Sequence, residues 1–468
     1  MSLTNVPVDR MTVTFRSKKI EDDTDLAALG ITENSPIVLI GSSLPVVHAP
    51  TEQVVFLEDL TELEKKKAGL EIVPAGLQNL GNTCYFNAVI QSLKAIPELS
   101  GALKKHSESH PETPTALSNV IFQTFQSLQN STSFIVPAPL LSTFLTAHAQ
   151  FAQRTPQGQP MQQDAEECFT ELITDLKSVE ILPIAEQDMI TRSAFPPSNI
   201  VEQLFQGKFE HRMTNQELTE GQVEPQTVSA ETFLELECVI ENETHYMNEG
   251  ISLALTGQLS KYSDVLGRDC LYKTEKKIAV LPPILVVHFK RFYWKKKEAL
   301  AHWDSHRVKI GKNVNFPFFF DSFEFCTDSV QKELIPVRDQ KKEERDQMAN
   351  AAKLELEKKL DETPSEMLKD KEEDLEKSKP TEWFVERAPK RPSTGYYELF
   401  AIVAHQGRSA DGGHYIAYIK KRKNLWYEMN DANTYPRTDE DIKKLSGQAD
   451  RPCAYLTFYR ACEQIEIE

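Results

Sequence analysis

The segment GLQNLGNTCYFNAVIQSLKAI at residues 76–96 constrains the fold most, because a polar, glycine-bearing loop runs directly into an amphipathic helix. Apolar residues recur at spacings of three and four from Phe86 onward, so this stripe is expected to be buried. The helix then begins near Cys84, with Asn82 and Thr83 as candidate caps. Unpaired N–H groups and the positive end of the helix dipole favour a thiolate at such a position. Cys84 is therefore either a nucleophile or a small residue of the core.

Composition limits what can surround this helix. The 468 residues are 40% hydrophobic and 26% charged, which is ordinary for a globular protein and too long for one small core. The formal net charge of −17 argues against a protein that binds nucleic acid by neutralising phosphates. No apolar run reaches the roughly 18 residues of a membrane span, and the N-terminus lacks the pattern of a secretory signal. We expect a protein of the cytosol, and possibly also of the nucleus, with two or three structural units.

The spacing of the cysteines and histidines gives little sign of a metal site. Seven cysteines are spread thinly and none forms a C-x-x-C pair, so we expect reduced thiols, no zinc ribbon and no cofactor. His106 and His110 lie four residues apart, but no cysteine pair lies near them. We expect them to be two solvated histidines near a helix end, and we expect no metal site.

The chain divides into three regions. Residues 1–42 carry two strands rich in Val and Ile, MTVTF and PIVLIG, and residues 43–74 form a linker of mixed polarity. From 75 to 463, helical patterns dominate the first part and strand patterns the second, which predicts an α+β architecture. Within it, residues 329–392 are dense in Lys and Glu. This insert is expected to be a solvated helix or helices with disordered flanks, and a partner-binding arm is the alternative.

Individual helices and strands follow from the spacing of apolar residues. Helices are expected over AVIQSLKAI, VIFQTFQSL, PLLSTFLTAH and CFTELITDL. Strands are expected over ETFLELECVI, ILVVHFKRF, YYELFAIVAH and YIAYIKK. The second of these strands has alternating apolar residues and is expected to be part of the scaffold.

A nucleophilic thiol needs a base that can also protonate a leaving amine, and near neutral pH histidine suits both steps. Of eleven histidines, His414 has the most suggestive context, because Gly412 and Gly413 precede it and a strand follows. Two glycines allow an extended chain to approach closely where a Cβ would block it. His414 is the candidate base, and a hairpin turn ending in a surface histidine is the alternative.

The cysteine segment, the histidine segment and MQQDAEECFTELITDL at 161–176 together resemble the ubiquitin-specific proteases, over most of residues 50–462. The resemblance implies a papain-like fold with a helical thumb, a mixed palm and β-rich fingers, the fingers coming from residues 201–275. It implies a thiol-dependent deubiquitinase that hydrolyses the isopeptide or peptide bond at the C-terminal glycine of ubiquitin. A ubiquitin-binding scaffold of this fold with little activity is the alternative, and an unrelated papain-type peptidase is another.

The resemblance also implies roles for single residues. Cys84 would be the nucleophile, His414 the general base, and Asn79 an oxyanion donor contributing about 3 kcal/mol. In NLWYEMNDANTY the third catalytic position falls on Asn430, where the family commonly has aspartate, and Asp431 is the alternative. The amide oxygen of Asn430 could accept the Nδ1–H of His414 and fix its tautomer. The residues implied to hold the ubiquitin tail are Gln78, Asp164, Gly412, Gly413 and Tyr415.

Asp164 has a local role as well. It precedes the helix of the 161–176 segment and is placed to cap it, with Glu167 in the capping-box position. Capping and binding of the ubiquitin tail are compatible roles for one carboxylate.

The ends of the chain indicate a branch of the family. The stretch from VVFLEDL onward and the ending LSGQADRPCAYLTFYRA are similar to the proteasome-associated branch, which carries an N-terminal ubiquitin-like domain. The proteasome regulatory particle is therefore an expected partner. Residues 1–42 match only the later part of such a domain, which argues against this partner. The resemblance further implies loops that block the tail channel until a partner moves them, and HQGRSADG at 405–412 suits such a loop.

Overall fold

A computed structural model describes residues 6, 8, 11–41, 73–131, 133–183, 196–295, 306–360, 392–409, 412–447 and 451–463. The chain divides into two compact units, Met1–Ile72 and Val73–Glu468, which are described separately. Among the described helices, none is both long enough and apolar enough to cross a membrane.

The N-terminal unit contains a small antiparallel sheet in the order β2-β1-β3. Its strands are β1 (Met11–Phe15), β2 (Lys18–Lys19) and β3 (Val38–Gly41). Strands were expected at MTVTF and PIVLIG, and both are present and paired with each other. Val38 and Ile40 of β3 are more than half exposed, so this sheet leaves apolar side chains uncovered. Most of the expected linker at 43–74 lies outside the described residues.

The second unit is built on an eight-stranded sheet with the order β16-β15-β14-β13-β17-β9-β6, and β12 pairs with β13 outside this path. Among the described strands of this sheet, only β6 and β9 pair in parallel. The strands are β6 (Leu236–Cys238), β9 (Ile284–Phe289), β12 (Phe319–Asp321), β13 (Tyr396–Gln406), β14 (His414–Arg422), β15 (Leu425–Asn430), β16 (Asn433–Arg437) and β17 (Cys453–Cys462).

Helices cover one face of this sheet. Side chains of these helices share one hydrophobic core with Val286 of β9 and Val403 of β13. The helices are α2 (Cys84–Lys94), α3 (Pro97–Ser109), α4 (Leu117–Asn130), α5 (Ala138–Ala147), α6 (Ala165–Asp175) and α8 (Ile200–Leu204). Ten of the eleven residues of α2 are buried, because it lies between the sheet and the other helices. The amphipathic stripe expected at 76–96 is therefore part of a helix that is buried almost all round.

A second hydrophobic core lies on the opposite face of the sheet. It contains Leu285 and Val287 of β9 together with Met247 and Ile251 of α9 (Met247–Leu255). Every residue of β9 is buried, His288 included, because both faces of this strand are covered. Arg291, just after β9, is also fully buried and donates to the carbonyls of Ala454, Ile310, Lys312 and Ser446.

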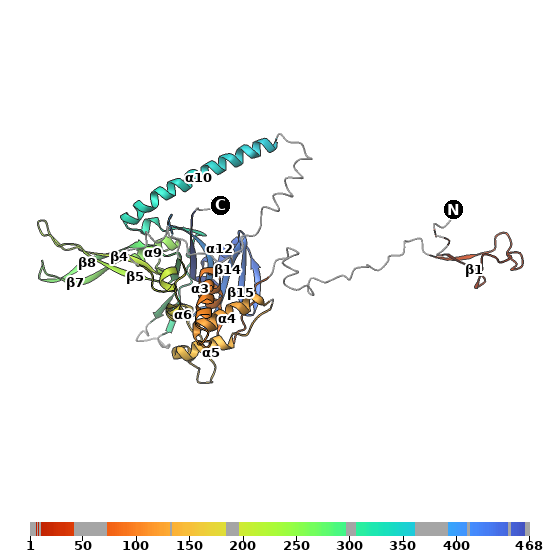
Figure 1. Cartoon of the computed structure of the whole chain (residues 1–468), viewed down its shortest axis with the longest axis horizontal. Helices are drawn as coiled ribbons and strands as arrows, with labels where there is room; N and C mark the ends of the chain where they lie inside the picture. The colour runs from red at the N-terminus through yellow and green to blue at the C-terminus, as the bar shows by residue number, and fades with distance from the viewer. Residues whose placement is uncertain are drawn as a thin grey trace. The chain divides into compact units, whose positions relative to one another are not determined.

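A separate antiparallel sheet has the order β5-β4-β8-β7, and Figure 1 shows β7 and β8 projecting from the rest of this unit. Its strands are β4 (Gly207–Asn215), β5 (Thr227–Phe233), β7 (Thr256–Ser263) and β8 (Arg268–Val280). These strands correspond to the fingers expected from residues 201–275. The remaining elements are β10 (Phe292–Lys295), β11 (His306–Lys309), α10 (Asp328–Leu360) and α12 (Asp439–Lys443).

Helix α10 forms the first half of the charged insert and runs for 33 residues (Figure 1). Arg338 anchors its first part, because the guanidinium pairs with Asp321 and lies 4.1 Å from the ring centre of Tyr396. Residues 361–391 lie outside the described residues.

Candidate active site

Cys84 is the first residue of α2 and is buried, with 2% of its surface exposed. The helix lies against β14, the strand that begins at His414. Thr83 occupies the N-cap position, but its side chain makes no capping bond. The expectation that Thr83 caps the helix is therefore wrong. Its hydroxyl instead accepts from the N–H of Leu80 at 2.9 Å and closes the preceding loop.

Asn79 organises this loop from within. Its Oδ1 accepts from the N–H groups of Gly81 at 2.9 Å and Thr83 at 3.2 Å. Its Nδ2 donates to Oδ2 of Asp431 at 3.0 Å, which ties the cysteine loop to the far end of the chain. Asn82, at a φ of 52°, donates its side-chain amide to the carbonyl of Pro160. Asn82 therefore fastens the loop to a neighbouring segment.

His414 lies between the cysteine and Asn430. Its Nε2 is 2.7 Å from Oδ1 of Asn430, the last residue of β15, and 3.9 Å from Oδ2 of Asp431. The side chain of Cys84 also interacts with the ring and favours its protonated form. Nδ1 was expected to face Asn430, which is wrong, because Nε2 makes this contact. Nδ1 is then the ring nitrogen that remains for Cys84.

The surroundings of His414 favour its protonated form and raise its pKa to about 9. The hydrogen bond with Cys84 is the largest cause, and burial, which lowers the pKa, comes second. The hydrogen bond to Asn430 and the charges of Cys84 and Asp431 add to the rise. The ring can therefore hold a proton next to the sulfur at neutral pH.

Glu428 fixes the orientation of the Asn430 amide. The Nδ2 of Asn430 donates to Oε1 of Glu428 at 3.5 Å, which leaves Oδ1 turned toward His414. Glu428 is in turn held by the guanidinium of Arg437 at 2.8 Å. Nothing in the sequence analysis indicated Glu428, although its position two residues before Asn430 on a strand places both side chains on one face.

Asp431 has a different task. It has a φ of 50°, and its two carboxylate oxygens accept from Asn79 at 3.0 Å and Asn87 at 2.8 Å. Its backbone carbonyl accepts from the N–H of Leu77 at 2.8 Å. A Cβ added at Gly76 would lie 2.5 Å from the same carbonyl, so only glycine fits there. Asp431 therefore joins the cysteine segment to the end of β15.

A second histidine lies directly behind the first. His405 of β13 is fully buried, and neither ring nitrogen has a hydrogen-bond partner among the described residues. Burial, followed by the charges of Lys309 and His414, lowers its pKa to about 3. A Cβ added at Gly413 would lie 2.4 Å from the Nε2 of His405, whereas at Gly412 the nearest atom is 3.7 Å away. Gly413 is therefore required by packing inside the sheet.

Aromatic rings form a floor across strands β14, β13 and β17. Tyr415 is buried, and its ring centre lies 4.8 Å from that of His405 and 5.8 Å from that of Tyr455. The hydroxyl of Tyr455 donates to Oδ1 of Asp164 at 2.7 Å, and the same oxygen caps α6 by accepting from Glu166. The expected capping role of Asp164 is thus confirmed.

A hollow of about 270 Å³ lies beside Asp164. Its lining residues are Asp164, Glu166, Glu167, His288, Lys290, Phe292, Tyr293 and Tyr455. Burial, followed by the charge of Glu235, raises the pKa of Glu166 above its usual range. Three carboxylates line the hollow and one lysine faces them, so it suits a chain segment that carries positive charge.

One further side chain contacts the thiol. The amide of Gln162 donates to Sγ of Cys84 at 3.7 Å, and the sequence analysis did not identify this residue. Its position two residues before Asp164, which was expected to bind the ubiquitin tail, is the sequence feature that could have indicated it. Gln78 is exposed, and its backbone N–H donates to Ile135. Gly412 and Gly413 are also exposed at the start of β14, next to His414.

Among the described residues, two groups of three side chains have the donor atoms and the spacing to hold a metal ion. They are His106, His110 and Glu180, and separately Glu166, Glu235 and His288. The second group lines or adjoins the hollow beside Asp164, where Lys290 competes with a cation for the same carboxylates. Neither group includes Cys84 or His414.

Comparison with known proteins gives one consistent answer. Residues 75–459 match the ubiquitin carboxyl-terminal hydrolase family. The chain is 32% identical to ubiquitin carboxyl-terminal hydrolase 6 of Arabidopsis thaliana, over 98% of this chain and 92% of the relative. It is also 32% identical to ubiquitin carboxyl-terminal hydrolase 6 of Schizosaccharomyces pombe, with the same coverage. Ubiquitin carboxyl-terminal hydrolase 14 of Caenorhabditis elegans is 27% identical over 98% of this chain. The chain therefore belongs to the ubiquitin carboxyl-terminal hydrolase family and is a cysteine-type deubiquitinase.

Proposed function

We propose that Cys84, His414 and Asn430 are the catalytic residues with which this chain hydrolyses the bond at the C-terminal glycine of ubiquitin. The observation that carries the proposal is the contact of one thiol, one imidazole and one amide oxygen, brought together from α2, β14 and β15. This is the arrangement by which a histidine activates a cysteine and is itself oriented by a third group.

The reaction follows from these positions. His414 takes the proton of the Cys84 thiol, and the thiolate attacks the glycine carbonyl, whose π electrons move to its oxygen. The imidazolium of His414 then gives its proton to the leaving amine, and the C–N bond breaks to leave a thioester on Cys84. A water molecule, deprotonated by His414, attacks the thioester and releases the carboxylate of ubiquitin and the thiol. Asn430 keeps the ring in one tautomer throughout.

Asn79 is the proposed oxyanion donor. Its Nδ2 group carries two protons, and one of them is donated to Asp431. The second proton, together with the backbone N–H of Cys84, is the donor pair we assign to the oxyanion. The bond to Asp431 holds the amide in place before substrate arrives, which is the condition under which such donors stabilise a transition state.

The tail of ubiquitin is proposed to run over the aromatic floor toward Cys84. Asp164 is held by Tyr455 and by the N-terminus of α6, so its carboxylate is fixed and can accept N–H groups of an extended chain. The other residues we assign to tail binding are Gln78, Gly412, Gly413 and Tyr415. An extended diglycine needs little width, and the exposed glycines at the start of β14 leave that width open.

A reporter in which an amide joins ubiquitin's C-terminus to a fluorophore tests the proposal. Cys84→Ala should lower turnover by at least about 10⁴-fold, because the covalent step is lost. Cys462→Ala removes a partly exposed thiol at the last residue of β17 and should turn over at the parental rate. Turnover by Cys84→Ala close to the parental rate would remove Cys84 as the nucleophile. Tight ubiquitin binding without turnover in the unmodified chain would favour the scaffold function.

We also propose that the enzyme works in a reducing compartment, the cytosol or nucleus, and acts on conjugates at the proteasome. All seven cysteines are free thiols, which supports the first point. The similarity of the chain to the proteasome-associated branch supports the second. The loop expected at 405–412 begins inside β13, which ends at Gln406 and buries His405, and residues 410–411 lie outside the described residues. The segment after Gln406 is proposed to hinder the tail channel until a partner moves it. Turnover measured with and without added proteasome regulatory particles tests this, and equal rates would contradict it.

A further inference from the structure

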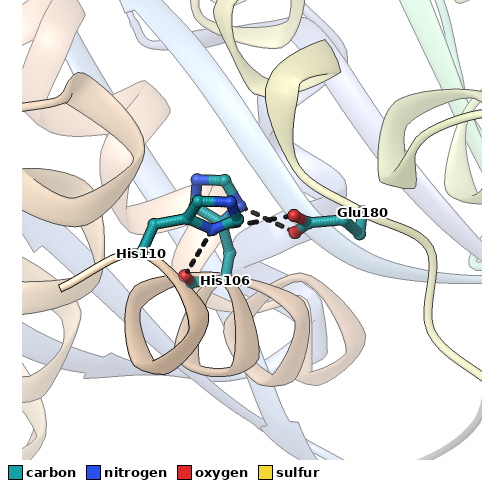
Figure 2. A group of neighbouring side chains, drawn as sticks. All are labelled: His106, His110 and Glu180. Atoms are coloured by element: carbon teal, nitrogen blue, oxygen red, sulfur yellow. Dashed lines mark hydrogen bonds and ion pairs between the residues drawn. The ribbon is translucent and has the colours of Figure 1, made fainter. Parts of the chain in front are cut away.

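The first of the two candidate metal clusters lies outside the active site. His106 is in the last turn of α3 and His110 is its C-cap residue, so their side chains lie on one face of the helix end. Glu180 lies two residues beyond the short 3-10 helix η3 (Leu176–Ser178). Figure 2 shows both rings turned toward the Glu180 carboxylate. Nδ1 of His106 is 2.7 Å from Oε2, and Nδ1 of His110 is 3.7 Å from Oε1.

The expectation that these are two solvated histidines is wrong for His106. It is 7% exposed, because α3 buries this face, and its ring centre lies 4.5 Å from that of His110. The side chains of His110 and Glu180 are 38% and 50% exposed. The cluster is therefore closed on the side of His106 and open to water on the other side.

We propose that His106, His110 and Glu180 bind a zinc ion. Zinc takes imidazole nitrogen and carboxylate oxygen at about 2.0–2.2 Å in a tetrahedral arrangement, which places neighbouring ligand atoms about 3.3 Å apart. The two nitrogen–oxygen distances here, 2.7 and 3.7 Å, lie on either side of that spacing. Ligand atoms of all three residues lie within 4.8 Å of one another. Small side-chain rotations are therefore enough to admit the ion, with water from the open side as fourth ligand.

Two imidazoles select the class of ion. Nitrogen donors suit zinc and the late first-row metals, whereas magnesium and calcium require oxygen donors. Binding breaks two local hydrogen bonds. Nδ1 of His110 must leave the carbonyl of His106, which lies 3.1 Å away, and Nδ1 of His106 must exchange its 2.7 Å bond to Glu180 for the ion. Three bonds to zinc replace these two hydrogen bonds.

The ion would connect two parts of the thumb that are 74 residues apart in sequence, the end of α3 and the chain after η3. It touches neither Cys84 nor His414, so its proposed role is to hold these helices together. Zinc should therefore raise the thermal stability of the folded chain, because an ion that binds only the folded state stabilises it in proportion to its saturation.

The test uses zinc and cobalt(II) in a Cys84→Ala background, since the catalytic thiol and imidazole can themselves take up these metals. Zinc should bind with about one equivalent and raise Tm, and cobalt(II) should give the visible bands of four-coordinate nitrogen and oxygen ligation. Adding His110→Ala or Glu180→Gln should weaken zinc binding by at least about tenfold, because even outer partners of ligands cost that much. Both positions are half exposed, so the metal-free Tm should change little.

Two control variants locate the ion. His245→Ala removes an exposed histidine outside the cluster, and Glu235→Gln disrupts the second candidate cluster. Both should bind zinc as the background does. Zinc binding that survives His110→Ala and Glu180→Gln unchanged, that is lost in Glu235→Gln instead, or that shows no saturation in the background would each overturn the proposal.

Discussion

Asn430 and Asp431 together supply the hydrogen-bond acceptor and the negative charge that a single aspartate would supply beside His414. Asn430 accepts the hydrogen bond from His414 at 2.7 Å but brings no charge. Asp431 brings a charge at 3.9 Å, but both of its oxygens are taken by the amides of Asn79 and Asn87. The negative charge thus stays near the imidazolium while an uncharged group fixes the ring. Substitution of Asn430 should therefore mainly lower activity, and substitution of Asp431 should mainly lower stability.

Asn430→Ala should lower kcat/KM on the order of 100-fold, because the ring loses the acceptor that fixes its tautomer. Its Tm should change little, since His414 and Asn430 are both partly exposed. Asp431→Asn, which tolerates the positive φ, should instead lower the free energy of unfolding by about 1–3 kcal/mol, because one amide donor loses its acceptor. Reporter kinetics and thermal melts of the two variants measure this. A larger loss of kcat/KM in Asp431→Asn at unchanged Tm would make Asp431 the third catalytic residue.

The two glycines in the connection between β13 and β14 should respond differently to substitution. Gly413 lies against His405 and cannot accept a Cβ, whereas Gly412 has space around it. Gly413→Ala should therefore lower Tm, because the new methyl group meets the imidazole and the carbonyl of Gln406. Gly412→Ala should keep Tm and raise KM for the ubiquitin reporter, because the methyl group narrows the tail path. Equal Tm values for the two variants would contradict the packing role of Gly413.

Periodicity predicted most elements because each is encoded by its own residues, but ETFLELECVI, expected as one strand, is divided between β5 and β6 of different sheets. The apolar spacing after Cys84 and Asp164 predicted α2 and α6, and both helices are present. The side-chain partners were not predictable in this way. Asn87 is 2% exposed inside α2 because its amide reaches Asp431, which is 344 residues away in sequence. Local pattern carries no information about such a distant partner.

His405 of β13 and His414 of the adjacent strand β14 have pKa values that are shifted in opposite directions. The pKa of His414 is raised to about 9 by its contact with Cys84, and that of His405 is lowered to about 3 by burial. A raised pKa stabilises the fold below the unfolded value of about 6.5, and this contribution is lost as pH rises through about 9. A lowered pKa has the opposite sign, so its contribution is present above about 6.5 and is lost as pH falls toward 3. The combined contribution of these two histidines to the stability of the fold should therefore be greatest at about pH 6.5 and should fall on either side of it.

Replacing His405 tests the fall in stability on the acid side of about pH 6.5. Between pH 6.5 and 4.5 the unfolded chain takes up a proton at this position and the folded chain does not, which costs up to about 1.4 kcal/mol per pH unit. Between pH 6.5 and 4.5, the free energy of unfolding of His405→Leu, measured with urea, should therefore fall by about 2–3 kcal/mol less than that of the parent. Any loss of packing shifts its whole curve and leaves this difference intact, and His245→Leu at an exposed position should follow the parent. Parallel curves for parent and His405→Leu would mean that His405 takes up its proton in the folded state as readily as in the unfolded chain.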